Sequence, residues 1–327
     1  SSIYTGAPET LDDGIDQDCD GGDDLTCVGN YEFTADSASQ IAALEYCAVI
    51  TGFLFIANNT NLDGLSSLIT VGDYLYIFSN SALTNVDGLS SLTTVGSELY
   101  IESNDVLMNV DGLSSLTDVG GYLEISYNAA LTNVDGLSSL TDVGDWLAIA
   151  DNSSLTNVDG LSSLTTVGSD LNISYNAALT NVDGLSSLIT VGDDLYIYNS
   201  AALANVDGLS SLTTVGGSLK LYDNAALTNV DGLSNLTDVD GDLYLRYHGA
   251  LTNVDGLSSL TTVGVHLYLQ YNDALTNVDG LSSLTDVGGN LYISYNDTLC
   301  QDSVDDLVAA CTIVGATYTS DNLGTCP

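Results

Sequence analysis

The chain has 327 residues, and 44 Asp and Glu residues against 2 Lys and Arg give it a formal net charge of −42. Surfaces that bind nucleic acid or anionic membranes need clustered cations, so both classes of partner are excluded. Apolar residues make up 45% of the chain, which is enough for a core. Its apolar runs fall far short of the roughly 18 residues that cross a bilayer, so no membrane insertion is expected.

The first 26 residues form an acidic arm, with eight acids between Glu9 and Asp24. The run 16–24 follows the start of a calcium-binding loop, with acids at alternate positions and then Gly. The predicted Ca²⁺ ligands are Asp16, Asp18, Asp20, the Gly22 carbonyl and Asp24. Cys27 stands where an EF-hand loop has its bidentate Glu. The alternative to a calcium site is that this acidic segment is a solvated tail. Residues 12–21 resemble the Asp-x-Asp-x-Asp-Gly repeats of secreted bacterial surface proteins.

Two features predict a secreted or cell-surface protein. The chain opens with Ser1-Ser2 rather than Met, as expected of a chain without its export signal. Its six Cys all lie in the two end regions, a pattern that favours disulfide staples over cytosolic thiols.

Residues 27–53 are predicted to cap the N-terminal end of the core. Ile41 and Leu44 give residues 35–47 the pattern of a short amphipathic helix, with Asp36 or Ser37 as its N-cap. Such a helix covers the open end of a repeat array and blunts its edge strands.

Residues 54–299 consist of a 24-residue repeat. The Asp-Gly pair occurs ten times, from Asp63 to Asp279, at nine intervals of 24 residues. Within one copy, 83–106, no helical spacing of apolar residues is sustained, and Gly88 and Gly96 interrupt it. We predict three short extended segments per repeat, with turns at the Asp-Gly and Val-Gly steps. Successive coils then stack in parallel about 4.8 Å apart, as a mainly β parallel solenoid of about ten coils.

An Asn column follows the Leu-x-Ile segment of each repeat. Its members are Asn80, Asn104, Asn128, Asn152, Asn176, Asn224, Asn272 and Asn296, interrupted by Ser200 and His248. An amide at a buried bend can bond to the backbone of its own coil and of the next coil. This column resembles the asparagine ladder of leucine-rich repeats, and the whole unit, over residues 27–327, resembles the receptor L-domain family. The resemblance implies a right-handed β-solenoid.

Two further columns are candidate functional surfaces. The Asp residues of the Asp-Gly pairs either fix their turn, by accepting the backbone N–H two residues on, or bind divalent cations along the rod. An outward Tyr column is either a stack that stabilises the sheet or a contact face for a protein or a sugar ring. The column consists of Tyr76, Tyr100, Tyr196, Tyr244, Tyr268 and Tyr292, interrupted by Glu124, Ala148, Asn172 and Lys220.

The sequence gives little support for catalysis. His248 and His266 fall in different columns of the repeat, and no zinc-binding spacing or phosphate loop occurs. The two cations, Lys220 and Arg246, are predicted to be salt-bridged among the many acids. We therefore expect a protein without enzymatic activity.

Residues 300–327 are predicted to form the C-terminal cap, with a helix over 302–311. Each end of the chain carries three Cys, namely Cys19, Cys27 and Cys47 at one end and Cys300, Cys311 and Cys326 at the other. A rod of ten coils, roughly 50 Å long, is too long for a bridge between its ends, so one thiol is left over at each end. The leftover thiols favour a disulfide between subunits, and joining unlike ends produces a chain that does not close.

The L-domain resemblance implies one disulfide within each end of the chain. Cys27 pairs with Cys47, and Cys300 pairs with Cys311 or Cys326. Cys19 then meets the remaining thiol of the next subunit.

Together these features predict an extracellular structural protein, the subunit of a head-to-tail filament that contains calcium and intersubunit disulfides. The alternative is a monomeric receptor-like module on the cell surface that binds a carbohydrate or a protein through its Tyr face.

Overall fold

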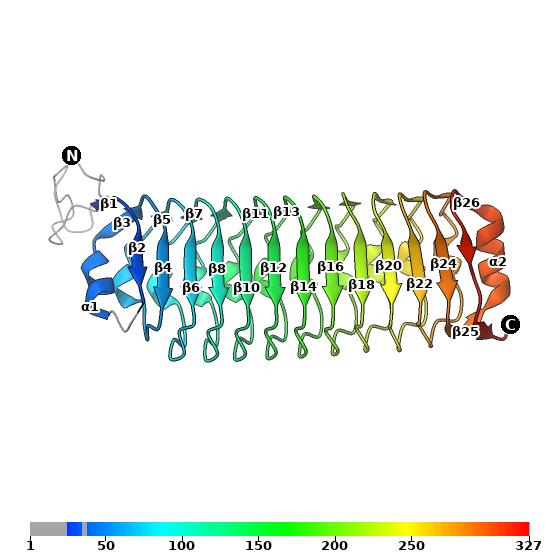
Figure 1. Cartoon of the computed structure of the whole chain (residues 1–327), viewed down its shortest axis with the longest axis horizontal. Helices are drawn as coiled ribbons and strands as arrows, with labels where there is room; N and C mark the ends of the chain where they lie inside the picture. Colours follow the sequence, from blue (N-terminus) through cyan, green and yellow to red (C-terminus); the bar gives the residue numbers. More distant parts are fainter. Residues whose placement is uncertain (1–24, 35–37, 327) are drawn as a thin grey trace.

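The protein is a long rod of stacked coils, as a computed structural model shows for residues 25–34 and 38–326 (Figure 1). Two parallel sheets of 13 strands each run the length of the rod. From β6 to β24, neighbouring strands of sheet B pair at a constant offset of 24 residues, for example Leu99 with Leu123, whereas β4 pairs with β6 at an offset of 21. The predicted fold class, a mainly β parallel solenoid, is confirmed.

The two sheets take alternate strands of the chain. Sheet A contains β1 (Leu25–Cys27), β3 (Cys47–Ile50), β5 (Thr70–Val71), β7 (Thr94–Val95), β9 (Asp118–Val119), β11 (Asp142–Val143), β13 (Thr166–Val167), β15 (Thr190–Val191), β17 (Thr214–Val215), β19 (Asp238–Val239), β21 (Thr262–Val263), β23 (Asp286–Val287) and β26 (Thr312–Ile313). Sheet B contains β2 (Tyr31–Phe33), β4 (Leu54–Ala57), β6 (Leu75–Phe78), β8 (Leu99–Glu102), β10 (Leu123–Ser126), β12 (Leu147–Ala150), β14 (Leu171–Ser174), β16 (Leu195–Tyr198), β18 (Leu219–Tyr222), β20 (Leu243–Arg246), β22 (Leu267–Gln270), β24 (Leu291–Ser294) and β27 (Thr317–Tyr318).

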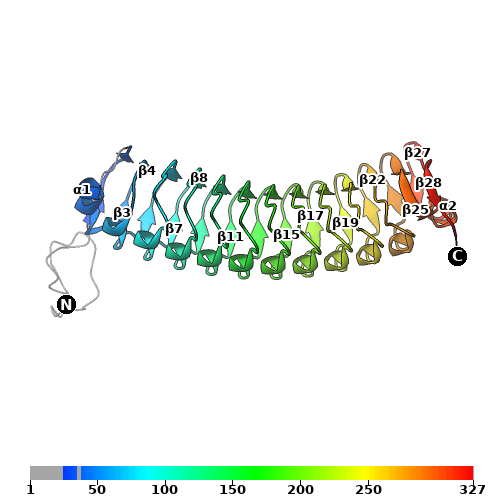
Figure 2. The same ribbon diagram turned by 90° about the horizontal axis from the view of Figure 1, so that it is seen from below.

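Each repeat contains two strands, so the prediction of three extended segments is wrong, whereas the turn predicted at the Asp-Gly step is confirmed and has the 3₁₀ form. In the turn at residues 87–89, the Leu89 N–H donates to the Val86 carbonyl at 2.9 Å. Figure 2 shows these turns in one row along the rod. The turns are η2 (Asp63–Leu65), η3 (Asp87–Leu89), η4 (Asp111–Leu113), η5 (Asp135–Leu137), η6 (Asp159–Leu161), η7 (Asp183–Leu185), η8 (Asp207–Leu209), η9 (Asp231–Leu233), η10 (Asp255–Leu257) and η11 (Asp279–Leu281).

One continuous apolar core fills the rod. In the repeat 83–106, seven apolar side chains are at most 1% exposed, namely Leu83, Val86, Leu89, Leu92, Val95, Leu99 and Ile101. Their equivalents in the coils above and below are also buried, so each coil packs on its neighbours. Burying one Leu or Val contributes roughly 1.5–3 kcal/mol, and most of this burial is available only within a stack.

The predicted asparagine ladder is confirmed. The Asn104 amide donates to the Ile77 carbonyl at 3.0 Å, and its oxygen accepts the Asn80 backbone N–H at 3.0 Å. The same pair of bonds recurs from coil to coil and satisfies backbone groups at a buried bend.

His248 weakens this ladder. It is fully buried, and its Nδ1 and Nε2 lie 3.2 Å and 3.1 Å from the Asn224 and Leu221 carbonyls. Burial lowers the pKa of His248, so the ring is neutral at pH 7 and its single N–H can serve only one of the two carbonyls.

We therefore expect His248→Asn to raise the free energy of unfolding by about 1–3 kcal/mol in urea denaturation. The new amide would donate to Leu221, as Asn272 does to Leu245, and its oxygen would accept the Asn224 N–H. The reciprocal change Asn176→His should destabilise the rod. A His248→Asn variant that unfolds more easily than the wild type would contradict this prediction.

The same substitution should alter the pH dependence. The folded-state pKa of His248 lies below its ordinary value of 6.5, so the unfolded state takes up the proton first. This contribution to stability is complete above pH 6.5 and is lost as the pH falls through the folded-state pKa. Between pH 7.5 and 5, the wild type should therefore lose more stability than His248→Asn in the same urea titrations.

Helices occur at both ends, as predicted. Helix α1 (Ala38–Ile41) continues into η1 (Ala42–Leu44), with Ile41 and Leu44 buried, whereas its predicted N-cap lies outside the described residues. Helix α2 (Gln301–Ala310) packs on β25 (Asn296–Cys300), β28 (Asn322–Gly324) and η11. In Figure 1 the two helices lie at opposite ends of the rod, and β26 and β27 are the last strands of sheets A and B at the C-terminal end.

Candidate functional site

The outer face of sheet B carries the predicted Tyr column, and it faces the viewer in Figure 1. Its six tyrosines lie on β6, β8, β16, β20, β22 and β24 and are half-buried. The rings of Tyr268 and Tyr292 are parallel, 4.7 Å apart, and Tyr76 and Tyr100 meet at 5.1 Å. The column is therefore a stack that stabilises the sheet and also an aromatic surface.

Two flanking aromatic columns were missed. Tyr198 and Tyr222 stack 4.5 Å apart, and Tyr247, Tyr271 and Tyr295 stack at 4.8 and 4.9 Å. The last three follow strands of sheet B and have positive φ. Their 24-residue spacing is visible in the sequence. The face of sheet B on which they lie depends on the left-handed backbone turn at these residues.

Both lone cations lie on this face. Lys220 Nζ lies 2.8 Å from Asp194 Oδ2, so the predicted salt bridge is confirmed. Arg246 has no ion pair among the described residues, which corrects the prediction for this residue. Its guanidinium lies instead 5.0–5.3 Å from the ring centres of Tyr244, Tyr247 and Tyr271.

The row of Asp residues lies on the 3₁₀ turns with its side chains exposed. The turn bond is the reverse of the prediction, because the Asp87 backbone N–H donates to the Asn85 side chain at 3.1 Å. The same Asn-to-Asp bond recurs along the row. Among the described residues, only Asp279 of this row accepts a side-chain hydrogen bond, from Ser303 at 3.3 Å. Partial burial and the charges of Asp111 and Asp159 raise the pKa of Asp135.

The predicted calcium ligands cannot be placed. Asp16, Asp18, Asp20, Gly22 and Asp24 lie outside the described residues, as does Cys19. Within the described part of the chain, Cys300, Asp302 and Cys326 lie close enough together to hold a metal ion. Both of these Cys belong to one disulfide, so no thiolate is free to bind an ion there.

The two histidines, which fall in different columns of the repeat, have different surroundings in the structure. His248 is part of the buried ladder, whereas His266 lies just before β22 and accepts the Asn290 backbone N–H through Nδ1 at 2.8 Å.

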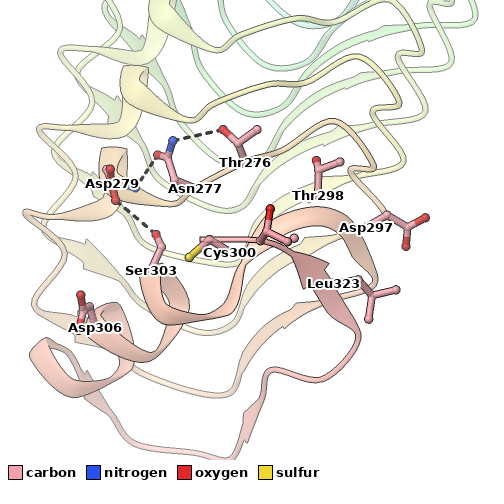
Figure 3. A pocket seen from close by; sticks show the side chains of 11 residues that line it. Thr276, Asn277, Asp279, Asp297, Thr298, Cys300, Ser303, Asp306 and Leu323 are labelled. Atoms are coloured by element: carbon pink, nitrogen blue, oxygen red, sulfur yellow. Dashed lines mark hydrogen bonds between the residues drawn. The ribbon is translucent and has the colours of Figure 1, made fainter. Parts of the chain in front are cut away.

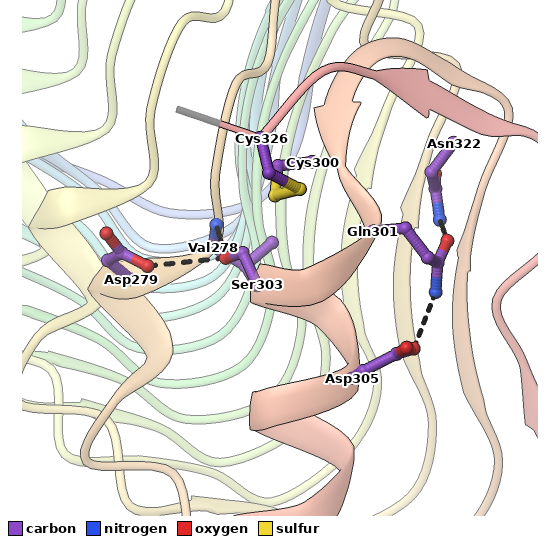
Figure 4. Close-up of a disulfide and its surroundings, with 8 residues drawn as sticks. All are labelled: Val278, Asp279, Cys300, Gln301, Ser303, Asp305, Asn322 and Cys326. Carbon is purple, nitrogen blue, oxygen red and sulfur yellow. Dashed lines mark hydrogen bonds between the residues drawn. A yellow bond between two sulfur atoms is a disulfide. The ribbon is translucent and has the colours of Figure 1, made fainter.

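The C-terminal end is held by a disulfide and a short polar network. Cys300, just before α2, is bonded to Cys326, with a Cα–Cα distance of 4.9 Å. Gln301 accepts from the Asn322 amide at 3.2 Å and donates to Asp305 at 2.8 Å (Figure 4). A cavity of about 790 Å³ lies beside this disulfide, with Asp279, Asp297 and Asp306 around it (Figure 3).

Strand β27 directs one backbone N–H along the rod, away from the protein. Leu243, Leu267 and Leu291 occupy one position in successive coils, and each donates its N–H to the next coil, at 2.9–3.1 Å. Thr317 pairs with Leu291 and occupies this position in the last coil. Its N–H has no acceptor among the described residues.

Strand β2 presents the complementary edge at the other end. Tyr31 pairs with Leu54, and its N–H donates inward to the Phe53 carbonyl at 2.9 Å. Because alternate residues of a parallel strand bond to opposite neighbours, the Asn30 carbonyl and the Glu32 N–H face outward.

The cysteines divide as the L-domain resemblance implied. Cys27 and Cys47 form a disulfide with a Cα–Cα distance of 5.9 Å. Cys311 carries the one free thiol among the described cysteines and is partly exposed. Burial raises its pKa, which lowers the thiolate fraction at pH 7.

No protein-family model matches the chain, and a search of curated proteins found no match. In the described part of the chain, neither helix has the length and apolar character to span a bilayer.

Proposed function

We propose that the protein is a non-enzymatic extracellular structural subunit that joins copies of itself head to tail. The observation that carries the proposal is that both sheets run the whole rod with every strand parallel. A second copy placed end to end therefore continues both sheets without reversing a strand, whereas a two-fold arrangement would reverse them. Such a contact joins two unlike ends. It extends as a filament unless each rod is rotated relative to the one before it so that the chain of rods closes into a ring.

The pairing between subunits can be stated atom by atom. Thr317 of one copy takes the register of Leu291, and Tyr31 of the next copy takes the register of Leu54. The Thr317 N–H then donates to the Asn30 carbonyl, and the Glu32 N–H donates to the Thr317 carbonyl. These bonds continue the ladder of sheet B by one more coil.

A disulfide would make this contact permanent. Cys311 is the thiol at the C-terminal end, and Cys19 of the next copy is its proposed partner. Forming the bond removes two protons and two electrons, which a small-molecule disulfide accepts as it is reduced to two thiols. The raised pKa of Cys311 lowers the fraction of reactive thiolate on this side of the contact.

Charge opposes assembly, because each copy carries −42. We propose that Ca²⁺ on the N-terminal arm and dissolved salt offset this repulsion. The Debye length falls from about 30 Å at 0.01 M salt to about 8 Å at 0.15 M, so the ends approach more easily in salt.

The test is electron microscopy and light scattering of the purified protein at 0.01 M and 0.5 M NaCl, each with CaCl₂ or a chelator. We expect filaments with an axial repeat of one rod length, favoured by salt and Ca²⁺, and ladders on non-reducing gels. Dispersed monomers under all four conditions would overturn the proposal and favour the receptor-like module.

A further inference from the structure

The outer face of sheet B is hollowed at its middle. On β10, β12 and β14 the aromatic columns give way to small side chains, among them Ala148 and Ala150. A cavity of about 230 Å³ opens there. We call it the notch, and its floor and nearest walls are formed by Trp146, Ala148, Ala150, Asn172, Ser174 and Tyr198.

The walls of the notch are aromatic and held by neighbouring rings. Trp146 meets Tyr122 edge to face, with ring centres 6.0 Å apart. On the other side Tyr175 meets Tyr198 edge to face at 5.2 Å, and Tyr198 stacks on Tyr222 at 4.5 Å. A ligand therefore meets rings that are already positioned, which lowers the entropy lost on binding.

The floor carries polar atoms without partners. Ser174 is 1% exposed, and its Oγ has no hydrogen-bond partner among the described residues. The buried Oδ1 of Asn172 also lacks a partner in this part of the chain. Buried polar groups are normally paired, so two unpaired groups under one cavity point to a hydrogen-bonding occupant.

The charges at the notch restrict the ligand. Glu124 and Asp151 line it, and Glu124 accepts a hydrogen bond from Ser126 at 2.7 Å. Neither Lys220 nor Arg246 lines it. An anionic ligand would therefore be repelled without compensation, and the ligand is neutral or cationic.

The spacing of the walls separates these two possibilities. Trp146 precedes a four-residue strand and Tyr175 on the far wall follows one, so their backbones are about 16 Å apart across the sheet. A cation–π contact extends only about 6 Å from a ring centre, so a compact ammonium group uses only part of this span. A broad ligand with an apolar face and hydroxyl groups on its edge fits better.

We propose that the notch binds a pyranose ring of a neutral saccharide. The apolar face of the ring lies against Trp146 or the tyrosines, and its hydroxyl groups bond to Asn172, Ser174 and the carboxylates. The volume of the notch is below the roughly 300–1,000 Å³ of drug-sized sites. It suits one sugar ring, with the next sugar of the chain on the rim. This site is independent of end-to-end assembly, since it lies at the middle of the rod.

Trp146 is the only Trp in the 327-residue chain, so its fluorescence reports on this site alone. The full-length protein is titrated with cellobiose, maltose, lactose and chitobiose to high millimolar concentration. The matched variants are Ala148→Tyr, which fills the notch with the side chain that the coils two steps away carry at this position, and Ala148→Ser, which leaves it open. Tetramethylammonium chloride and digalacturonate test the cationic and anionic alternatives.

We expect saturable binding of at least one neutral disaccharide at millimolar concentration, retained in Ala148→Ser and weakened at least tenfold in Ala148→Tyr. Ser174→Ala should weaken it severalfold without changing the melting temperature. The proposal is overturned by no saturable response to any of the four disaccharides, by equal binding to Ala148→Tyr, or by saturation with tetramethylammonium or digalacturonate alone.

Discussion

Replacing Gly160 by Ala should destabilise the rod by more than about 3 kcal/mol, the upper end of the range for overpacking. A Cβ built at Gly160 lies 1.8 Å from the Val134 carbonyl oxygen and 2.4 Å from its carbon, both in the backbone of the preceding coil. No side-chain rotation relieves a clash with backbone, so the two coils must separate. Separation breaks the ladder and opens the core at the centre of the rod.

The matched control is Gly249→Ala, since a Cβ at Gly249 meets nothing within 4 Å. We expect this variant to unfold within about 0.5 kcal/mol of the wild type in urea, followed by far-ultraviolet circular dichroism. Equal stability of the two variants would show that the coils adjust to a Cβ, contrary to the close approach described above.

The repeat made the architecture predictable. A strict 24-residue interval fixes the same register for the coils between Leu75 and Ser294, so their parallel stack, buried columns and Asn ladder follow from one copy. The turn at the Asp-Gly step was predicted, but its 3₁₀ form and the loss of the third extended segment were not, because Val86 and Leu89 suit a strand as well as a turn. Only the close approach of coils at Gly88, where a Cβ would lie 1.9 Å from the Leu62 carbonyl oxygen, requires the tighter path.

The candidate sites were less predictable for a physical reason. The Tyr column lies within a strand, where side chains alternate, so its outward direction follows from the sequence. Tyr247 and Tyr271 follow a strand at φ of 62° and 59°, and the sequence does not show that this turn returns them to the same face. The notch was visible only as gaps at Glu124, Ala148 and Asn172. That these gaps form a cavity depends on the flanking rings.

Replacing Thr317 by Pro should abolish head-to-tail assembly and leave the single rod intact. The Thr317 N–H has no acceptor among the described residues, so its loss removes no hydrogen bond from this part of the rod. In the proposed contact the same N–H donates to Asn30 of the next copy, and the proline ring would meet that carbonyl instead. We expect a loss of about 3 kcal/mol at the contact, which is about a hundredfold in the end-to-end association constant.

Thr317→Ala is the control, because it keeps the N–H and changes only an exposed side chain. Light scattering at 0.5 M NaCl should show wild-type assembly for Thr317→Ala and monomers for Thr317→Pro, with equal melting temperatures at concentrations where all three are monomeric. Filaments of normal length from Thr317→Pro would mean that sheet B does not continue between subunits. A Cys311→Ser variant separates strand pairing from disulfide formation. It should still form filaments, which sodium dodecyl sulfate then dissociates. If the disulfide alone made the contact, this variant would form no filaments.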